Sequence, residues 1–265
     1  MQNTNWSPET VLGAPGVRNP VLSLEVLEET DSTNLQLLQQ ARDGAPHGKC
    51  LLALRQTAGR GRQGRRWLSD EEGSLTFSLL WLFAKPAAQL SGLPLVVTLA
   101  LIQALEPTGV DGLALKWPND LLRHGRKVAG VLVELTRAPN GETAAVLGIG
   151  LNVSLKDALA DQISMPATDL RDAEGHVPAR PALLRAILGQ LCTLLPTFSE
   201  AGFTPFMQEY WERSALRGRR VRLILPSQQV ETGECAGISH DGALLLHQQG
   251  RLNTFHGGEI SLRTA

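Results

Sequence analysis

Apolar and polar residues alternate over several short stretches of the chain, which predicts strands separated by a few helices. Residues 21–29 alternate as in a half-buried strand, and residues 50–56 form a short apolar strand. Residues 31–45 begin with capping side chains, continue with apolar positions at helical spacing and end on a glycine, so we expect a helix there. Further strands are expected at 74–83, 113–117 and 143–154, a hairpin over 120–136 turning at His124 and Gly125, and helices at 90–106, 181–195 and 199–215.

The pattern changes near residue 216. After Arg217, short strands alternate with turn residues, which is typical of a small barrel. Residues 1–20 are rich in Pro, Gly and Asn without periodicity. We therefore expect an irregular arm at 1–20, a large domain at 21–216 and a small β domain at 217–265.

Composition narrows the class of protein. The chain has 265 residues and a formal net charge of -1, so no global field attracts nucleic acid or a membrane surface. No signal peptide and no long apolar run is evident, and three cysteines without C-x-x-C spacing favour a reducing compartment. The six histidines lack metal-ligand spacing. We expect a cytoplasmic protein without a metal site, a DNA partner or a membrane partner.

One stretch, GRGRQGRRW at 59–67, matches two phosphate-binding patterns in part. A dinucleotide-binding loop requires a helix after its third glycine, but the residues after Gly64 lack helical periodicity. A P-loop requires Lys followed by Ser or Thr, where this chain has Arg65 and Arg66. Both interpretations fail on context.

The loop's composition still predicts anion binding. Glycines let main-chain amides approach a ligand, and arginines supply permanent bidentate donors. Ordering about nine residues costs roughly 1 to 2 kcal/mol each, and four like charges repel one another, so we expect disorder until an anion binds. A solvated basic turn or an RNA contact fits the loop alone equally well.

Other motifs distinguish these alternatives. KWPND at 116–120 places a proline turn between a lysine and an Asn-Asp pair at a strand end, where loops carry function. RKVAG places Lys127 beside Gly130 at the start of the returning strand, and GIGLN ends on Asn152. Each motif has an ordinary structural explanation, but their order, together with DSTN at 31–34 and the loop, is specific.

In this order the motifs resemble those of the biotin protein ligases (biotin-[acetyl-CoA-carboxylase] ligases). The resemblance covers about residues 22 to 263, including the terminal GGEISLR. It implies an α+β fold: a mixed sheet with flanking helices, similar to the core of class II aminoacyl-tRNA synthetases, followed by a small SH3-like β-barrel. The pattern of predicted elements agrees with this division.

The resemblance implies a reaction in two steps. Biotin and ATP, with Mg2+, would give biotinyl-5'-AMP and pyrophosphate. A lysine of the biotin carboxyl carrier protein of acetyl-CoA carboxylase would then take the biotinyl group as an amide. Bringing two anionic substrates together requires cations aimed at both, which gives the arginines and Lys127 a chemical role.

Site residues follow from the resemblance position by position. Ser32, Thr33, Asn34 and Gln56 would line the biotin pocket, and the backbone of Arg60, Gly61 and Arg62 would close over biotin and the acyl phosphate, with Gly130 beside them. Lys127 would bridge the biotin carboxylate and the α-phosphate. The expected catalytic residues are Lys127, Arg62 and Asp120, the last to position the carrier lysine. The expected ATP-binding residues are Arg65, Trp67, which would pack on the adenine, Lys116, Asn119 and Asn152.

Two rivals remain to be weighed. A lipoate or octanoate ligase would have a similar fold, but the Gly/Arg loop and KWPND favour biotin. A nucleic-acid-binding module would use the loop and the barrel, but near-neutral charge and a single Tyr disfavour it. Only about 20 irregular residues precede the first strand, so we expect no winged-helix domain and no repressor activity. The oligomeric state is open, with a homodimer as one alternative.

Overall fold

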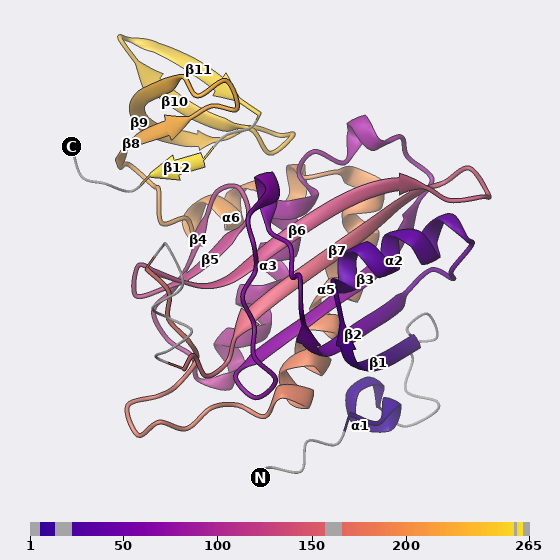
Figure 1. Cartoon of the computed structure of the whole chain (residues 1–265). Coiled ribbons are helices and arrows are strands. Elements are labelled where there is room, and N and C mark those ends of the chain that lie inside the picture. Colours follow the sequence, from indigo (N-terminus) through magenta and orange to yellow (C-terminus); the bar gives the residue numbers. More distant parts are fainter. Residues whose placement is uncertain (1–5, 14–22, 157–165, 257–258, 262–265) are drawn as a thin grey trace.

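The computed structural model describes residues 6–13, 23–156, 166–256 and 259–261. Their strands build a large sheet and, above it in Figure 1, a small one. The large sheet contains β1 (Ser23–Thr30), β2 (Lys49–Gln56), β3 (Ser74–Phe83), β4 (Leu113–Lys116), β5 (Asp120–Arg123), β6 (Arg126–Arg137) and β7 (Thr143–Asn152). The small sheet contains β8 (Arg220–Ile224), β9 (Val230–Ile238), β10 (Leu244–Gln248), β11 (Arg251–Phe255) and β12 (Glu259–Ser261).

The large sheet is mixed, with the order β1-β2-β3-β7-β6-β5-β4. β1 runs parallel to β2, and the other neighbours are antiparallel. β5 and β6 form the predicted hairpin, and its turn residues His124 and Gly125 both have positive φ, at 48° and 77°. This is the backbone that two-residue hairpin turns favour.

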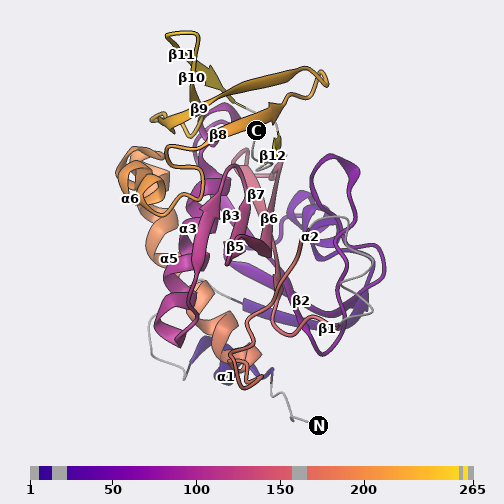
Figure 2. The same cartoon turned by 90° about the vertical axis from the view of Figure 1, so that its left-hand side faces the viewer.

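Helices cover the two faces of this sheet differently. Figure 2 shows α2 (Thr33–Arg42) on one side and α3 (Leu93–Leu105) with α5 (Arg180–Ala201) on the other. Nearly every side chain of α3 is buried, because the helix lies between the sheet and α5. The main hydrophobic core is therefore on the α3 side, while a smaller cluster around Leu37 and Leu38 lies under α2.

The N-terminal arm is not irregular throughout, contrary to expectation. Residues Pro8–Leu12 form the short helix α1, capped by the Ser7 hydroxyl. Val11 is buried against the core, and Arg185 of α5 donates to the carbonyls of Glu9 and Thr10. The helix was missed because a single turn is too short to show periodicity. The rest of 1–20 lies outside the described residues apart from Trp6, Ser7 and Gly13.

The two predicted C-terminal helices also differ from the structure. α5 passes through Pro196 and ends at Ala201, where two helices had been expected to meet. Leu195 and Phe198, on both sides of the proline, are buried, and this packing outweighs the hydrogen bond that proline cannot donate. The expected helix at 199–215 is reduced to α6 (Met207–Glu212), preceded by a 3-10 turn at Thr204–Phe206.

By length and composition alone, α5 is apolar enough to cross a membrane. In the structure one stripe of the helix packs against α3 and the sheet, while its other side carries the exposed Arg185. This is the amphipathic pattern of a core helix. We therefore assign α5 to the protein core rather than to a membrane span.

The small sheet is antiparallel, with the order β11-β10-β9-β8-β12. It contacts the large domain through the turn between β9 and β10, where the Trp117 indole donates to the Gly242 carbonyl at 3.0 Å and the Ser91 hydroxyl donates to the Asp241 carbonyl at 2.8 Å. A mixed sheet with flanking helices followed by a small SH3-like β domain was the predicted fold class, and it is confirmed.

Candidate active site

Part of the α2 face of the large sheet is lined mainly by small and polar residues. Strand alternation places every second residue of β3, β7 and β6 on this face, and Leu80, Ala144 and Val146 of this set pack under α2. The remaining residues are Ser74, Thr76 and Ser78 on β3, Gly148, Gly150 and Asn152 on β7, and Gly130, Leu132 and Glu134 on β6. The register aligns Thr76, Gly150 and Gly130 in one row and Ser78, Gly148 and Leu132 in the next. We call this surface the site face.

The Gly/Arg loop, residues 59–67, folds back on itself in the structure. Arg60 and Arg66 pair as an isolated antiparallel bridge, the Gly61 amide donates to the Arg65 carbonyl at 2.7 Å, and the Trp67 amide donates to the Gly59 carbonyl at 2.9 Å. The loop is thus a small hairpin. Its charges do not simply repel one another, because some find partners elsewhere in the chain.

The loop ends by placing the Trp67 indole over the glycines of the site face. A β-carbon at Gly150 would fall 2.2 Å from Trp67 Cε2, and one at Gly130 would fall 3.4 Å from Trp67 Cζ3. Glycine is therefore required at position 150 for this approach of the ring. Trp67 Nε1 is buried and has no hydrogen-bond partner among the described residues, which leaves one donor for a ligand.

Lys127 lies beside the same ring. Its Nζ is 5.8 Å from the Trp67 ring centroid and 2.5 Å from Asp120 Oδ1. Lys116 Nζ lies 3.9 Å from the other oxygen of Asp120. The carboxylate therefore sits between two lysines and offsets part of their charge, in line with the grouping expected from the sequence.

Arg62 reaches the KWPND turn. Its Nη1 donates to Asn119 Oδ1 at 3.0 Å, and Asn119 Nδ2 donates to the Val131 carbonyl at 2.6 Å. A cavity of about 150 Å³ adjoins them, lined also by Trp117, Gly242 and His256. Arg62 and Asn119 therefore lie at the edge of β6 beside the small sheet, where the cavity is also lined by Val131 and Val133 of the α3 face.

The DSTN motif forms the start of α2 and the far end of the site face. Ser32 is buried and its hydroxyl caps the helix. The Thr33 amide donates to Gln56 Oε1 at 2.8 Å. Asn34 Nδ2 donates to the Leu132 carbonyl and to Glu134, so both of its hydrogens are used within the protein.

Two further predicted residues lie around this centre. Asn152 is buried on the site face, and its Nδ2 donates to the Thr168 carbonyl at 3.1 Å. The exposed Arg65 contributes its main chain to the loop hairpin. The structure thus gathers the predicted residues on or around one face of the sheet.

Sequence reasoning missed Ser78 and Glu134. The Ser78 hydroxyl donates to Asn34 Oδ1 at 2.6 Å and lies 2.7 Å from Thr33 Oγ1. Glu134 Oε1 pairs with Arg60 Nη2 at 3.1 Å. The alternation of Ser and Thr in SLTFS, and a single charge in the apolar run VLVELT, were visible in the sequence and could have identified both.

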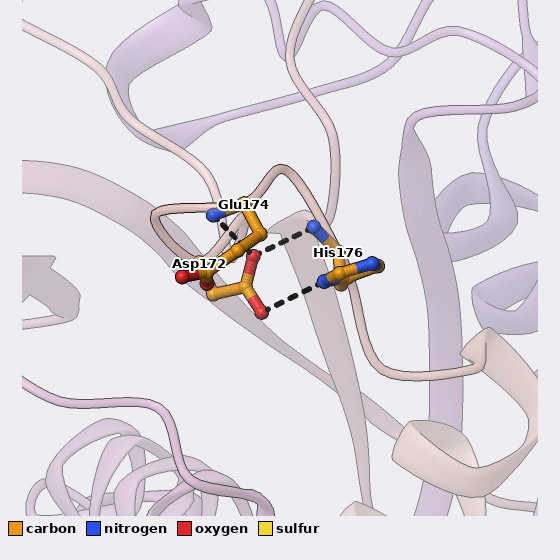
Figure 3. A group of neighbouring side chains, drawn as sticks. All are labelled: Asp172, Glu174 and His176. Atoms are coloured by element: carbon orange, nitrogen blue, oxygen red, sulfur yellow. Dashed lines mark hydrogen bonds and ion pairs between the residues drawn. The ribbon is translucent and has the colours of Figure 1, made fainter.

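A separate group could suggest a metal centre. Asp172, Glu174 and His176 lie together in Figure 3, and all three are exposed. Asp172 accepts from the main-chain amides of Glu174 at 3.0 Å and His176 at 2.7 Å, which accounts for the arrangement as a capped turn. The group carries no argument for a bound ion.

Comparison with known proteins identifies the family. Residues 26–153 match the Biotin/lipoate A/B protein ligase family, and residues 217–263 match the Biotin protein ligase C terminal domain. The chain is 34% identical to the bifunctional ligase/repressor BirA of Escherichia coli, over 92% of this chain and 75% of that protein. It is 33% identical to the biotin--[acetyl-CoA-carboxylase] ligase of Mycobacterium tuberculosis, over 89% and 88%.

Solved structures agree. The biotin protein ligase of Aquifex aeolicus in complex with biotin and ATP superposes with a TM-score of 0.76 at 33% identity, covering 92% of this chain and 99% of that one. The fold and the site define a ligase of the biotin/lipoate class. Within that class, the chain belongs to the biotin protein ligase family.

Proposed function

We propose that the chain forms biotinyl-5'-AMP from biotin and ATP and transfers the biotinyl group to one lysine of the biotin carboxyl carrier protein of acetyl-CoA carboxylase. The observation that carries the proposal is the grouping of Lys127 and the Trp67 indole over the glycines of the site face, with Arg62 at the neighbouring KWPND turn. The names of the relatives, which include a biotin--[acetyl-CoA-carboxylase] ligase, support the choice of substrates.

In the first step, a carboxylate oxygen of biotin attacks the α-phosphorus of ATP. A new P–O bond forms, the bond to the β-phosphate oxygen breaks, and pyrophosphate leaves. Lys127 and Arg62 lower the barrier because they offset negative charge that builds up where two anions meet. The Lys127–Asp120 contact of 2.5 Å holds the ammonium in place without a ligand.

The biotin end is assigned to the α2 side. Ser32, Thr33, Asn34 and Gln56 surround it, with Gly130 in the floor and the main chain of Arg60, Gly61 and Arg62 closing above. Because Asn34 donates both hydrogens within the protein, we assign it the shaping of the pocket and leave direct contacts to its neighbours. Gln56 accepts through Oε1 from Thr33, so its amide nitrogen is the group offered to the ligand.

The nucleotide is assigned to the opposite end, where Arg65, Trp67, Lys116, Asn119 and Asn152 lie. Mg2+ would enter bound to the ATP phosphates, which is how this ion usually meets its protein sites. The Asp120 carboxylate is paired with Lys127 and Lys116, so it does not suit a dedicated metal site.

In the second step, the neutral amine of the carrier lysine attacks the acyl carbon, AMP leaves with the bonding electrons, and the nitrogen loses a proton. Asp120 is the carboxylate placed to orient that amine. Residues 21–216 are proposed as the catalytic domain and 217–265 as the SH3-like domain. A cytoplasmic location fits a carrier substrate of carboxylase metabolism.

Assembly and DNA binding are separate proposals. β5 pairs with β6 only as far as Gly130, and the next amide of β6, that of Val131, donates to the Asn119 carbonyl. From Leu132 to Arg137, this edge of β6 has no neighbouring strand among the described residues. Such an edge can pair with a second copy, and a homodimer is the arrangement we would look for. Absence of repressor activity stays a prediction, supported by the net charge of -1.

The proposal is tested by product analysis. The protein is incubated with ATP, Mg2+, biotin and a purified biotin carboxyl carrier domain, and the carrier is examined by mass spectrometry. We expect one biotinyl amide on one lysine, and none on a carrier whose acceptor lysine is replaced by Arg. Modification with lipoate in place of biotin, and none with biotin, would contradict the proposed substrate.

A further inference from the structure

We propose that Glu134 is a positioning residue that anchors the Gly/Arg loop over the site face. The inference rests on the proposed function, because it concerns how long the adenylate is held. Glu134 lies on β6 in the same alternating set as Gly130 and Leu132, so its side chain rises from the site face. Its two oxygens have different partners.

One oxygen reaches the loop. Glu134 Oε1 lies 3.1 Å from Arg60 Nη2, with the two side chains 22% and 43% exposed. Arg60 in turn pairs with Arg66 along the main chain of the loop hairpin. Fixing Arg60 therefore fixes the hairpin that also carries Arg62.

The other oxygen is held by the pocket. Glu134 Oε2 accepts from Asn34 Nδ2 at 3.0 Å. Asn34 is itself held on both sides, because Ser78 donates to its Oδ1 at 2.6 Å and that oxygen packs against Gly148, where a β-carbon would fall 2.1 Å away. Glu134 is therefore held in turn by the buried amide of Asn34, at the start of α2.

Through Glu134, the position of the loop residue Arg60 depends on the pocket residue Asn34. A carboxylate is needed because it accepts from an amide and from a guanidinium at once, and hydrogen bonds between ionised partners are stronger than neutral ones. In Glu134→Gln the new side chain can still accept from Asn34, but its amide group no longer attracts Arg60. The pocket should stay intact while the loop opens more often.

The experiment measures release of biotinyl-5'-AMP, made in place from labelled biotin and ATP without a carrier and chased with unlabelled biotin and ATP. In Glu134→Gln we expect release about three- to tenfold faster, as for loss of a partly exposed charged pair, with a smaller change in the rate of adenylate formation. Arg60→Gln should give the same increase. The double variant should be no faster than either single one, because both remove the same contact.

Glu29→Gln is the matched control. Glu29 of β1 pairs with Arg55 of β2 at 2.5 Å. The variant therefore loses a similar ion pair without changing a contact of the loop. We expect wild-type release from this variant. If Glu134→Gln does not fold, Arg60→Gln on the exposed side of the same contact carries the test.

The outcomes separate the two proposals. Wild-type protein that forms no biotinyl-5'-AMP would overturn the proposed function itself. Wild-type protein that forms it, with release unchanged in Glu134→Gln and Arg60→Gln, would overturn the anchoring role alone. Additive increases in the double variant would also overturn it, because they would show that the residues act separately.

Discussion

The two faces of the large sheet are built from the same strands but have different roles: one packs the core and the other carries the candidate site. On the α3 face, Phe77, Ile149 and Leu151 are buried in the main core. On the α2 face, the neighbouring positions are Ser78, Gly148 and Gly150. Because side chains alternate along each strand, the same strands place buried apolar residues on one face and the candidate site residues on the other. The Trp67 ring can lie directly on the α2 face because the side chains are small there, and the face stays in place because the reverse face is densely packed.

The largest effect is expected from removing the Lys127 ammonium, which lies beside the Trp67 ring. Lys127→Met should lower ATP–pyrophosphate exchange by about 10² to 10³-fold or more, because the lost charge matters most in the transition state. The exchange rate with biotin is the measurement. Lys49→Met, which loses the pair between Lys49 of β2 and Glu25 of β1, is the control and should exchange at the wild-type rate. Wild-type exchange in Lys127→Met would refute the assignment.

Neighbouring residues on β7 test the two faces against each other. Leu151→Ala should cost about 2 to 5 kcal/mol in the free energy of unfolding, because Leu151 is fully buried and leaves a cavity. Gly150→Ala should instead weaken ATP binding, because its methyl would displace the Trp67 ring that is assigned to the adenine. Denaturant unfolding and ATP titration separate the effects. Equal losses of stability with unchanged ATP affinity would remove the distinction between the faces.

A smaller effect is expected at the edge of the site face. Arg62→Gly loses the contact with Asn119 Oδ1 at 3.0 Å and frees the loop backbone. Biotinyl-5'-AMP should then escape, and biotin labelling of bystander proteins in a lysate should rise by about tenfold, the equivalent of one charge-assisted hydrogen bond. Labelling is read on a streptavidin blot. No rise above wild type would mean that Arg62 does not hold the loop closed.

The smallest effect concerns stability far from the site. Burial lowers the pKa of His47, although Glu142 raises it in part, and the His47 Nδ1 accepts from the Leu82 amide at 3.1 Å. The folded state therefore favours the neutral ring. The contribution of His47 to the free energy of unfolding should be fully present above the unfolded pKa of about 6.5. It should be lost progressively as pH falls from there toward the lowered folded pKa.

Thermal unfolding between about pH 7 and 5 checks this expectation. His47→Gln cannot titrate, so its unfolding temperature should fall less over this range than that of the wild type. Parallel curves for the two proteins would show that His47 does not contribute to the pH dependence.

Many of the helices and strands could be predicted from the sequence, and those that could not have physical reasons. Strands such as Ser74–Phe83 were predictable because periodicity and turn residues are local. The course of α5 through Pro196 was not, because it depends on burial of Leu195 and Phe198 against distant elements. Local periodicity predicted two helices, at 181–195 and 199–215, whereas tertiary packing carries one helix through Pro196.

The same holds for the site. The composition of the Gly/Arg loop predicted anion binding but left alternatives, and its order with the KWPND turn and the other motifs decided between them. The contact that ties the loop to the sheet could not be predicted, because Arg60 pairs with Glu134, which lies far along the chain. Glu134 became visible only once the register placed it on the site face.

The most direct test of the central claim, that the site face joins biotin to ATP, is exchange of labelled pyrophosphate into ATP with biotin, with lipoate and with no acid. The account predicts exchange that depends on biotin, is weak or absent with lipoate, and is lost in Lys127→Met. Exchange with lipoate alone, or biotin-dependent exchange that survives in Lys127→Met, would contradict it.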